Sequence, residues 1–269
     1  MSQWLFINES FRDALERAGL AGFDDWMNVS RESEEPSDRE ESMTVVDVKG
    51  FRVYLKRRRP ERAGFRFFLR RSRLRREAEN AMFLRELGVP TAEVVAAGER
   101  RRRGCATEAF VAVREIRGAR PLGDYVREFW TERRGRRRRE QIALIEKLAL
   151  IVRRMHDAGY VAHDLYWRNI LVSDAPEGAH AFWIIDHPRG GRRLLGLRDG
   201  KIRDLACLNR DAGPCVSRAD RVRFVRFYLG RRRLGSSGAQ LCRRVEARKG
   251  PPLREGETPS GSIRREQET

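Results

Sequence analysis

Residues 160–172 read Tyr-Val-Ala-His-Asp-Leu-Tyr-Trp-Arg-Asn-Ile-Leu-Val. Within this stretch Asp164 precedes Asn169 by five positions, and an apolar run follows directly. A second apolar run, Trp183–Ile185, ends on the carboxylate of Asp186. An Asp, an Asn five residues later and a second Asp after a short strand have the spacing of a phosphoryl-transfer loop. The stretch therefore predicts a kinase-like catalytic loop.

Each of the three polar residues has a predicted role. Asp164 is the candidate catalytic base, because a carboxylate at hydrogen-bond distance can align an attacking hydroxyl and take its proton. Asn169 and Asp186 offer oxygens to Mg²⁺, an ion that uses few protein ligands together with phosphate oxygens and water. Taken alone, Asp164 could simply cap the turn that follows a helix. In Asp186-His187-Pro188, Pro188 fixes φ and predicts a stiff loop. His187 either contacts phosphate or substrate, or is a packed or solvent-facing histidine without such a role.

Three further residues are candidates for holding the nucleotide. Lys56 ends the alternating segment 51–56, and a lysine on a strand can reach the α- and β-phosphates of ATP when a Glu on the next helix holds it. Glu77 is the favoured partner, because Glu79 points about 200° further round the same helix. Glu115 ends a later predicted strand, where a kinase hinge would read adenine. No GxGxxG motif precedes Lys56, so an inactive pseudokinase stays an alternative.

Hydrophobic periodicity predicts the order of helices and strands. Short amphipathic helices broken near glycines are expected within 9–27, followed by a flexible acidic loop over 31–41. The expected strands are 43–48, 51–55, 89–97 and 109–116, and the expected helices are 74–87, 122–130, 141–158, 203–209 and 218–229. Strands with one helix, followed mainly by helices, predict an α+β, two-lobed protein-kinase-like fold with a sheet-rich N-lobe and a helical C-lobe.

This order divides the chain into four predicted segments. Residues 1–42 form an N-terminal helical extension with the acidic loop, 43–118 the N-lobe, and 119–234 the C-lobe. The basic tail 235–269 is expected to be disordered, because glycine, serine, proline and charged residues dominate it.

The chain is strongly basic, with a net charge of +18 and a pI of about 10.9. Such a charge predicts attraction to nucleic acid, anionic lipid headgroups or phosphorylated glycans, although a solvated surface without a dedicated partner is equally open. The basic run 133–139 contains no aromatic residue, which argues against nucleic acid. The four cysteines form no CxxC pair, and neither a signal peptide nor a run of about 18 apolar residues is evident. We expect a cytoplasmic protein that can touch a membrane surface.

The combined motifs resemble the lipopolysaccharide core kinase family, which groups the Kdo kinases and the WaaP-type heptose kinases in the protein-kinase-like superfamily. The resemblance spans about residues 45–232. It rests on Tyr54-Leu55-Lys56, Arg76-Glu77, Leu87-Gly88-Val89-Pro90-Thr91, Ala96-Ala97-Gly98-Glu99, His163 to Leu171, Ile184-Ile185-Asp186, Arg203-Asp204-Leu205-Ala206 and Asp220 to Phe224.

The resemblance implies ATP- and Mg²⁺-dependent transfer of the γ-phosphoryl group to a sugar hydroxyl of lipopolysaccharide core, on Kdo or heptose, or of a similar glycolipid. The reaction would occur at the cytoplasmic face of the inner membrane, with peripheral contact between the protein and the anionic surface. Carried over by position, Lys56 and Glu77 would anchor phosphates and Asp164 would be the base. Asn169 and Asp186 would hold Mg²⁺.

The resemblance also implies that Asp204 braces the catalytic loop. One departure is Ala162, which stands where the family has a His two positions before the catalytic Asp. A bacterial protein kinase, or a non-catalytic pseudokinase or binding protein, is the alternative function.

Overall fold

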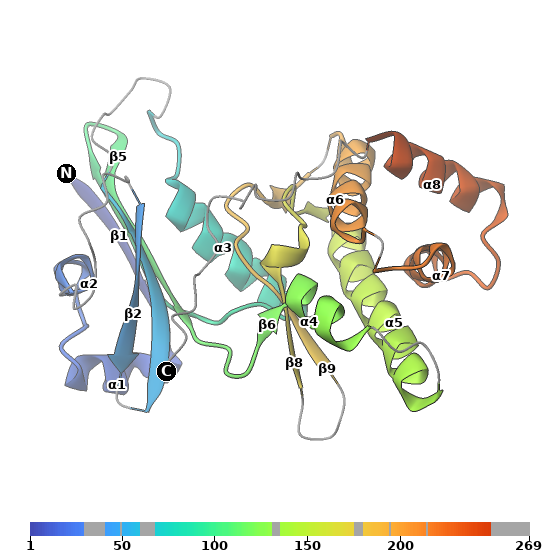
Figure 1. The fold of residues 1–269 in the computed structure, drawn as a ribbon. Coiled ribbons are helices and arrows are strands. Elements are labelled where there is room, and N and C mark those ends of the chain that lie inside the picture. Colours follow the sequence, from blue (N-terminus) through green and yellow to red (C-terminus); the bar gives the residue numbers. More distant parts are fainter. Residues whose placement is uncertain are drawn as a thin grey trace.

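The computed structural model describes residues 1–29, 41–48, 50–59, 68–130, 135–174, 180–193, 195–213 and 215–248. They form a sheet-rich lobe and a helical lobe (Figure 1). The first lobe comprises β1 (Ser2–Ile7), η1 (Glu9–Phe11), α1 (Arg12–Arg17), α2 (Phe23–Asn28), β2 (Glu41–Val48), β3 (Phe51–Arg58), α3 (Arg73–Glu86), β4 (Val94–Arg102) and β5 (Cys105–Arg114). The second comprises β6 (Arg120–Pro121), α4 (Leu122–Phe129), α5 (Gly135–Asp157), β7 (Tyr160–Val161), η3 (Trp167–Asn169), β8 (Ile170–Asp174), β9 (His180–Ile184), β10 (Gly191–Arg192), α6 (Leu197–Asp211), α7 (Arg218–Leu229) and α8 (Gly235–Arg248).

The first lobe is built on a five-stranded antiparallel sheet in the order β1-β4-β5-β3-β2. The predicted hairpin is present as β2 and β3, with Gly50 in the turn at φ +100°. The predicted strand 89–97 begins only at Val94 as β4. Pro90 has no N–H to donate, and instead its carbonyl accepts from Ile184 N at 2.9 Å, which ties this segment to the second lobe.

The N-terminal segment differs from the predicted helical extension. Residues 2–7 form β1, which pairs with β4 and so belongs to the sheet. Its residues 4–7 are all apolar, and alternate side chains pack on the two faces of the sheet. A run that is buried on both faces lacks the alternation that identifies a strand. The helices predicted around Gly19 and Gly22 are present as α1 and α2, and they cover one face of the sheet.

The other face of the sheet carries α3, the helix predicted over 74–87. The Ser72 side chain caps its first turn by accepting from Arg75 N at 3.1 Å, and Gly88 follows its end at φ +68°. The buried side of α3 packs against β4 and β5 through Leu74, Ala78 and Ala81. Glu77 lies on this same buried side, so the helix brings a carboxylate to the sheet.

The second lobe is mostly helical around one hydrophobic core. Helix α5 packs on α7, and α6 packs on α8, while β6, β8 and β9 form a small sheet next to α4 (Figure 1). Helix α5 begins at Gly135, earlier than the predicted start at 141. Arg138 explains part of this difference, because its guanidinium pairs with the buried carboxylate of Asp220 on α7 at 2.5 Å.

The tail prediction is wrong for residues 235–248, which form α8. Its glycine and serine content suggested a loop, but Gly238 is buried where a Cβ would lie 2.7 Å from the Leu234 side chain. The glycine therefore permits close packing rather than flexibility. Leu241 and Val245, one helical turn apart, pack on the second-lobe core. Residues 249–269, most of the predicted acidic loop, and residues 131–134 lie outside the described part of the chain.

No helix within the described ranges combines the length and apolar character that crossing a bilayer requires.

Candidate active site

Three charged side chains from distant parts of the sequence meet between the lobes. Strand β3 buries Val53, Leu55 and Arg57 toward one side, so the intervening Lys56 faces α3. Its Nζ lies 2.7 Å from Oε1 of Glu77, the predicted partner, and 3.0 Å from Oδ1 of Asp186, which follows β9. The arrangement connects the sheet, α3 and the second lobe through one ammonium group.

All three groups of this cluster are mostly shielded from solvent, and Glu77 exposes only 8% of its side chain. Burial by itself lowers the pKa of Lys56, but the attraction of Glu77 and Asp186 outweighs it and raises the pKa above its usual value. Burial likewise raises the pKa of Asp186, but the Lys56 ammonium outweighs it and holds that pKa below its usual value. Lysine and aspartate are therefore both charged at neutral pH.

Asp204 on α6 supports the backbone of the loop that carries Asp164. Its carboxylate is fully buried and accepts hydrogen bonds from the backbone N–H groups of Ala162, at 2.8 Å, and His163, at 2.7 Å. His163 has φ +67°, an uncommon conformation for a residue other than glycine. The bracing contact that the resemblance implied for Asp204 is therefore present.

A buried histidine also contacts Asp204. His156, at the end of α5, has its Nε2 3.2 Å from Oδ2 of Asp204 and its Nδ1 2.8 Å from the hydroxyl of Tyr228 on α7. Sequence reasoning missed His156, although its position four residues after the buried Val152 places it on the apolar side of α5. The imidazole that contacts Asp204 therefore comes from α5, whereas Ala162 occupies the loop position where the family has a histidine.

Asp164 and Asn169 are linked across a short 3-10 turn. The side-chain amide of Asn169 donates to the backbone carbonyl of Asp164 at 2.8 Å, which leaves its Oδ1 for another contact. The backbone N–H of Ile185 donates to the carbonyl of Asn169 at 2.9 Å. This bond holds the residue before Asp186 next to the turn. Asp164 keeps 20% of its side chain exposed, and its Oδ2 lies 3.6 Å from Nε of Arg189.

The segment after Asp186 is held on both sides. Asp186 has φ +58°, and Asn80 on α3 donates to the carbonyls of His187, at 2.7 Å, and Gly190, at 3.0 Å. His187 is 2% exposed, and its burial lowers its pKa and keeps the ring neutral. His187 is therefore packed inside the fold, which is one of the outcomes predicted for it. Asn80 was missed by sequence reasoning, although it lies one helical turn after Glu77.

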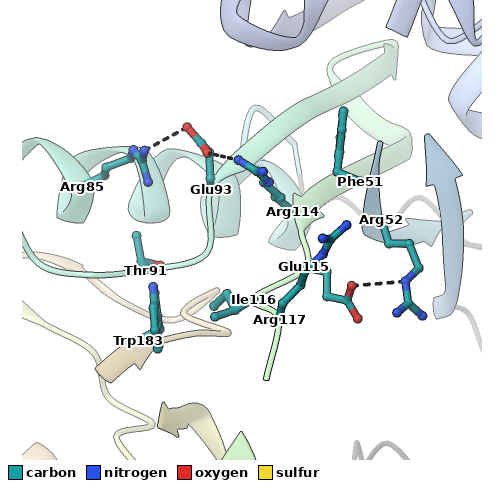
Figure 2. Close-up of a pocket in the computed structure, with 10 residues that line it drawn as sticks. All are labelled: Phe51, Arg52, Arg85, Thr91, Glu93, Arg114, Glu115, Ile116, Arg117 and Trp183. Carbon is teal, nitrogen blue, oxygen red and sulfur yellow. Dashed lines mark hydrogen bonds and ion pairs between the residues drawn. The ribbon is translucent and has the colours of Figure 1, made fainter. Parts of the chain in front are cut away.

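Glu115 lies at the connection between the lobes, away from the Lys56 cluster. Its backbone N–H donates to the carbonyl of Arg52 at 2.9 Å, and its Oε2 lies 3.2 Å from Nε of the same arginine. Figure 2 shows a pocket of about 300 Å³ at this connection, with the Arg52–Glu115 pair on one side and an Arg85–Glu93–Arg114 group on the other. Its lining residues are Phe51, Arg52, Arg85, Thr91, Glu93, Arg114, Glu115, Ile116, Arg117 and Trp183. The side chain of Glu115 is thus part of an ion pair.

Comparison with known proteins identifies the family to which the chain belongs. The family model described as "Lipopolysaccharide kinase (Kdo/WaaP) family" matches residues 24–228. The chain belongs to this family. Within it, the chain is 32% identical over 161 residues to the lipopolysaccharide core heptose(I) kinase WaaP of Pseudomonas aeruginosa. That match covers 58% of this chain and 59% of the relative, so it spans about three fifths of the relative's length.

A solved structure is also similar over most of the chain. It is described as WaaP in complex with acyl carrier protein, and it shares 25% identity at a TM-score of 0.71. The match covers 91% of this chain and 98% of that one. The predicted α+β, two-lobed, protein-kinase-like fold is confirmed by this likeness and by the membership in a kinase family.

Proposed function

We propose that this protein transfers the γ-phosphoryl group of ATP to a sugar hydroxyl of lipopolysaccharide core, on Kdo or heptose, or of a similar glycolipid. The observation that carries the proposal is the contact of Lys56 with both Glu77 and Asp186 beside the loop of Asp164 and Asn169. The family model and the similarity to a heptose kinase support the same class of reaction.

Lys56 and Glu77 act on the nucleotide. A strand-borne lysine held by a buried glutamate can meet the α- and β-phosphates as a fixed point charge. The pKa of Lys56, raised above its usual value by its two carboxylate neighbours, keeps that charge in place. Glu115 and its neighbours at the lobe connection are the proposed backbone contacts for adenine.

Asn169 and Asp186 fit Mg²⁺ as a bound partner of ATP. Asn169 offers an amide carbonyl oxygen and Asp186 an ionised carboxylate. So few protein ligands suit an ion whose other ligands are phosphate oxygens and water. When bound there, Mg²⁺ would neutralise charge on the transferred phosphoryl group. No cluster of three or more His, Cys, Asp or Glu residues that could hold a metal occurs in the described ranges.

Asp164 is the proposed base for the acceptor hydroxyl. The backbone of its loop is held by Asp204 and, at the end of the loop, by Asn169, and 20% of the Asp164 side chain is exposed to solvent. A carboxylate on a loop held in this way can align the hydroxyl for in-line attack and accept its proton.

The alternatives predict different substrates or no turnover. A protein kinase would label a polypeptide, and a pseudokinase would bind nucleotide without transfer. The intact Lys56–Glu77–Asp186 contacts favour a catalyst over a pseudokinase, even though no glycine-rich motif precedes Lys56.

The proposed setting is the cytoplasmic face of the inner membrane, where the net charge of +18 favours peripheral contact with anionic lipids. An acyl carrier protein is a further proposed partner, because the similar WaaP structure contains one. Retention of purified acyl carrier protein on the immobilised chain, compared with an unrelated protein of equal charge, tests this partner.

The test of the function is a transfer assay with radiolabelled γ-phosphate and Mg²⁺. The acceptors are a core glycolipid ending in Kdo, one carrying heptose, casein, and a reaction without acceptor. We expect label in one of the two glycolipids and none in casein. Label in casein alone would replace the proposal with the protein-kinase alternative, and binding of ATP without any transfer would replace it with the pseudokinase.

A further inference from the structure

An exposed cation lies beside the candidate base. The guanidinium of Arg189 has its Nε 3.6 Å from Oδ2 of Asp164. The two side chains differ in exposure, because Arg189 is 68% exposed and Asp164 only 20%. Arg189 therefore lies on the solvent side of Asp164, where an acceptor must arrive to reach the carboxylate.

The backbone that carries Arg189 is fixed from both lobes. Asn80 binds the carbonyls on either side of it, at His187 and Gly190. The N–H of Gly190 closes a turn onto the carbonyl of His187 at 3.1 Å. A Cβ at Gly190 would lie 2.1 Å from the hydroxyl of Tyr160, so the turn is pressed against the second-lobe core. The position of Arg189 next to Asp164 is thus determined by packing, while its side chain remains accessible.

Two more arginines surround the residue before Asp164. Arg193 has a terminal nitrogen 3.0 Å from Nε2 of His163, and Arg203 on α6 donates to the carbonyl of His163 at 3.2 Å. We call Arg189, Arg193 and Arg203 the arginine collar. Burial lowers the pKa of His163, which leaves this ring neutral and able to accept from Arg193.

The charges around the base are unequal. The collar supplies three positive charges. Within the described part of the chain, the carboxylates that act on His163, the residue that Arg193 and Arg203 contact, are Asp164 and the fully buried Asp204. Asp204 already accepts from two backbone N–H groups and His156. One accessible carboxylate does not balance three guanidinium groups. A guanidinium presents its donors in a planar fork that matches a carboxylate or a phosphate.

We propose that Arg189 binds an anionic group of the acceptor, a carboxylate or a phosphate, close to the hydroxyl that receives the phosphoryl group. Arg189 contacts Asp164 in the absence of the acceptor and exchanges it for the acceptor's anion on binding. This exchange leaves Asp164 free to meet the hydroxyl. The inference rests on the proposed function, and it adds a specificity: acceptors that lack the anion bind poorly.

The test compares Arg189→Gln, Arg189→Lys and wild type. Arg198→Gln, at the start of α6, removes the same charge from an exposed position outside the collar. The acceptors are a Kdo-bearing core glycolipid, its carboxyl methyl ester and its dephosphorylated form. In wild type we expect the missing anion to raise the acceptor KM by roughly 10- to 100-fold, the range for a charged hydrogen bond.

Arg189→Gln should raise the KM for the intact acceptor by a similar factor, remove the discrimination between intact and modified acceptors, and change the KM for ATP less than about twofold. Arg189→Lys should restore part of the discrimination. If methylation raises the acceptor KM of wild type, the anion is the carboxylate, and if dephosphorylation raises it, the anion is the phosphate. Discrimination that persists in Arg189→Gln, or a rise in kcat with an unchanged acceptor KM, would overturn the inference.

Equilibrium binding of the same three acceptors in the presence of a non-hydrolysable ATP analogue gives a readout without turnover. If wild type transfers phosphate to none of the acceptors, the proposed function fails, and the binding comparison still decides the role of Arg189. Equal binding of intact and modified acceptors by wild type would refute that role. Thermal unfolding of each variant confirms that the exposed substitutions leave the fold intact.

Discussion

Asp204→Ala is the most informative test of how the catalytic loop is supported. The Asp204 carboxylate is 0% exposed and accepts three hydrogen bonds, from the backbone N–H groups of Ala162 and His163 and from His156. Removing it leaves these donors buried without a protein acceptor. We therefore expect both a less stable protein and a misplaced Asp164.

The size of the effect follows from the number of stranded donors. Each buried donor without a partner costs about 1–3 kcal/mol, and water that enters the space left by the carboxylate recovers part of this. Asp204→Ala should therefore lower the free energy of unfolding by roughly 3–5 kcal/mol. Asp204→Asn keeps one oxygen but turns an NH₂ group toward the N–H of the other partner, so it should cost about 2–3 kcal/mol.

The assay is denaturant unfolding together with steady-state kinetics. Asp199→Asn, an exposed position on the same helix, is the matched control. A shift of the Asp164 carboxylate by about 1 Å should lower kcat by roughly 100-fold, with a smaller change in the KM for ATP. If Asp204→Ala unfolds within about 0.5 kcal/mol of wild type, as surface substitutions do, the bracing role is refuted.

Two further predictions concern the sheet-rich lobe. Lys56→Ala removes the ammonium group that contacts both Glu77 and Asp186, so kcat/KM for ATP should fall at least about 100-fold. Lys147→Ala on α5 is the control, and unchanged ATP kinetics in Lys56→Ala would point to another phosphate anchor. Glu99 is 0% exposed and accepts from Ser72 N at 2.5 Å, Arg101 at 2.6 Å and Arg75 at 3.2 Å. Burial raises its pKa, but the hydrogen bonds from Ser72 and Arg101 outweigh this and bring the pKa below its usual value. Glu99→Gln should cost about 2–4 kcal/mol at pH 7. Because the folded pKa is depressed, this contribution is present above the unfolded value of about 4.3 and is lost as the pH falls through the folded pKa. The gap between wild type and Glu99→Gln in denaturant unfolding should shrink on acidification, and an unchanged gap at pH 3 would contradict the assignment.

The parts of the fold that the sequence predicted have strong local signals. The β2–β3 hairpin, α3 and the helices α4, α5, α6 and α7 follow from periodicity and glycine positions. Strand β1 lacks alternation because both of its faces are buried, and α8 has a loop-like composition because Gly238 is needed for close packing. In both cases tertiary packing outweighs the local pattern.

The residues of the candidate site likewise include some that the sequence predicted and some that it did not. Asp164, Asn169 and Asp186 were predicted because their spacing is fixed along the chain, and the Lys56–Glu77 contact because a strand leads into a helix. Asn80 binds carbonyls more than 100 positions away, and the partners His156 and Asp204 are 48 positions apart. No spacing rule in a single sequence connects such residues, and only the fold brings them together.

The central claim is that Asp164 serves as the base in phosphoryl transfer. The most direct measurement is the rate of transfer from ATP to the core glycolipid by Asp164→Asn, together with its equilibrium affinity for ATP. We predict that transfer falls by at least about 100-fold, the range for loss of a general base, while the affinity for ATP changes less than about twofold. The exposed variant Asp199→Asn should keep both values. Transfer by Asp164→Asn at the wild-type rate would contradict the assignment.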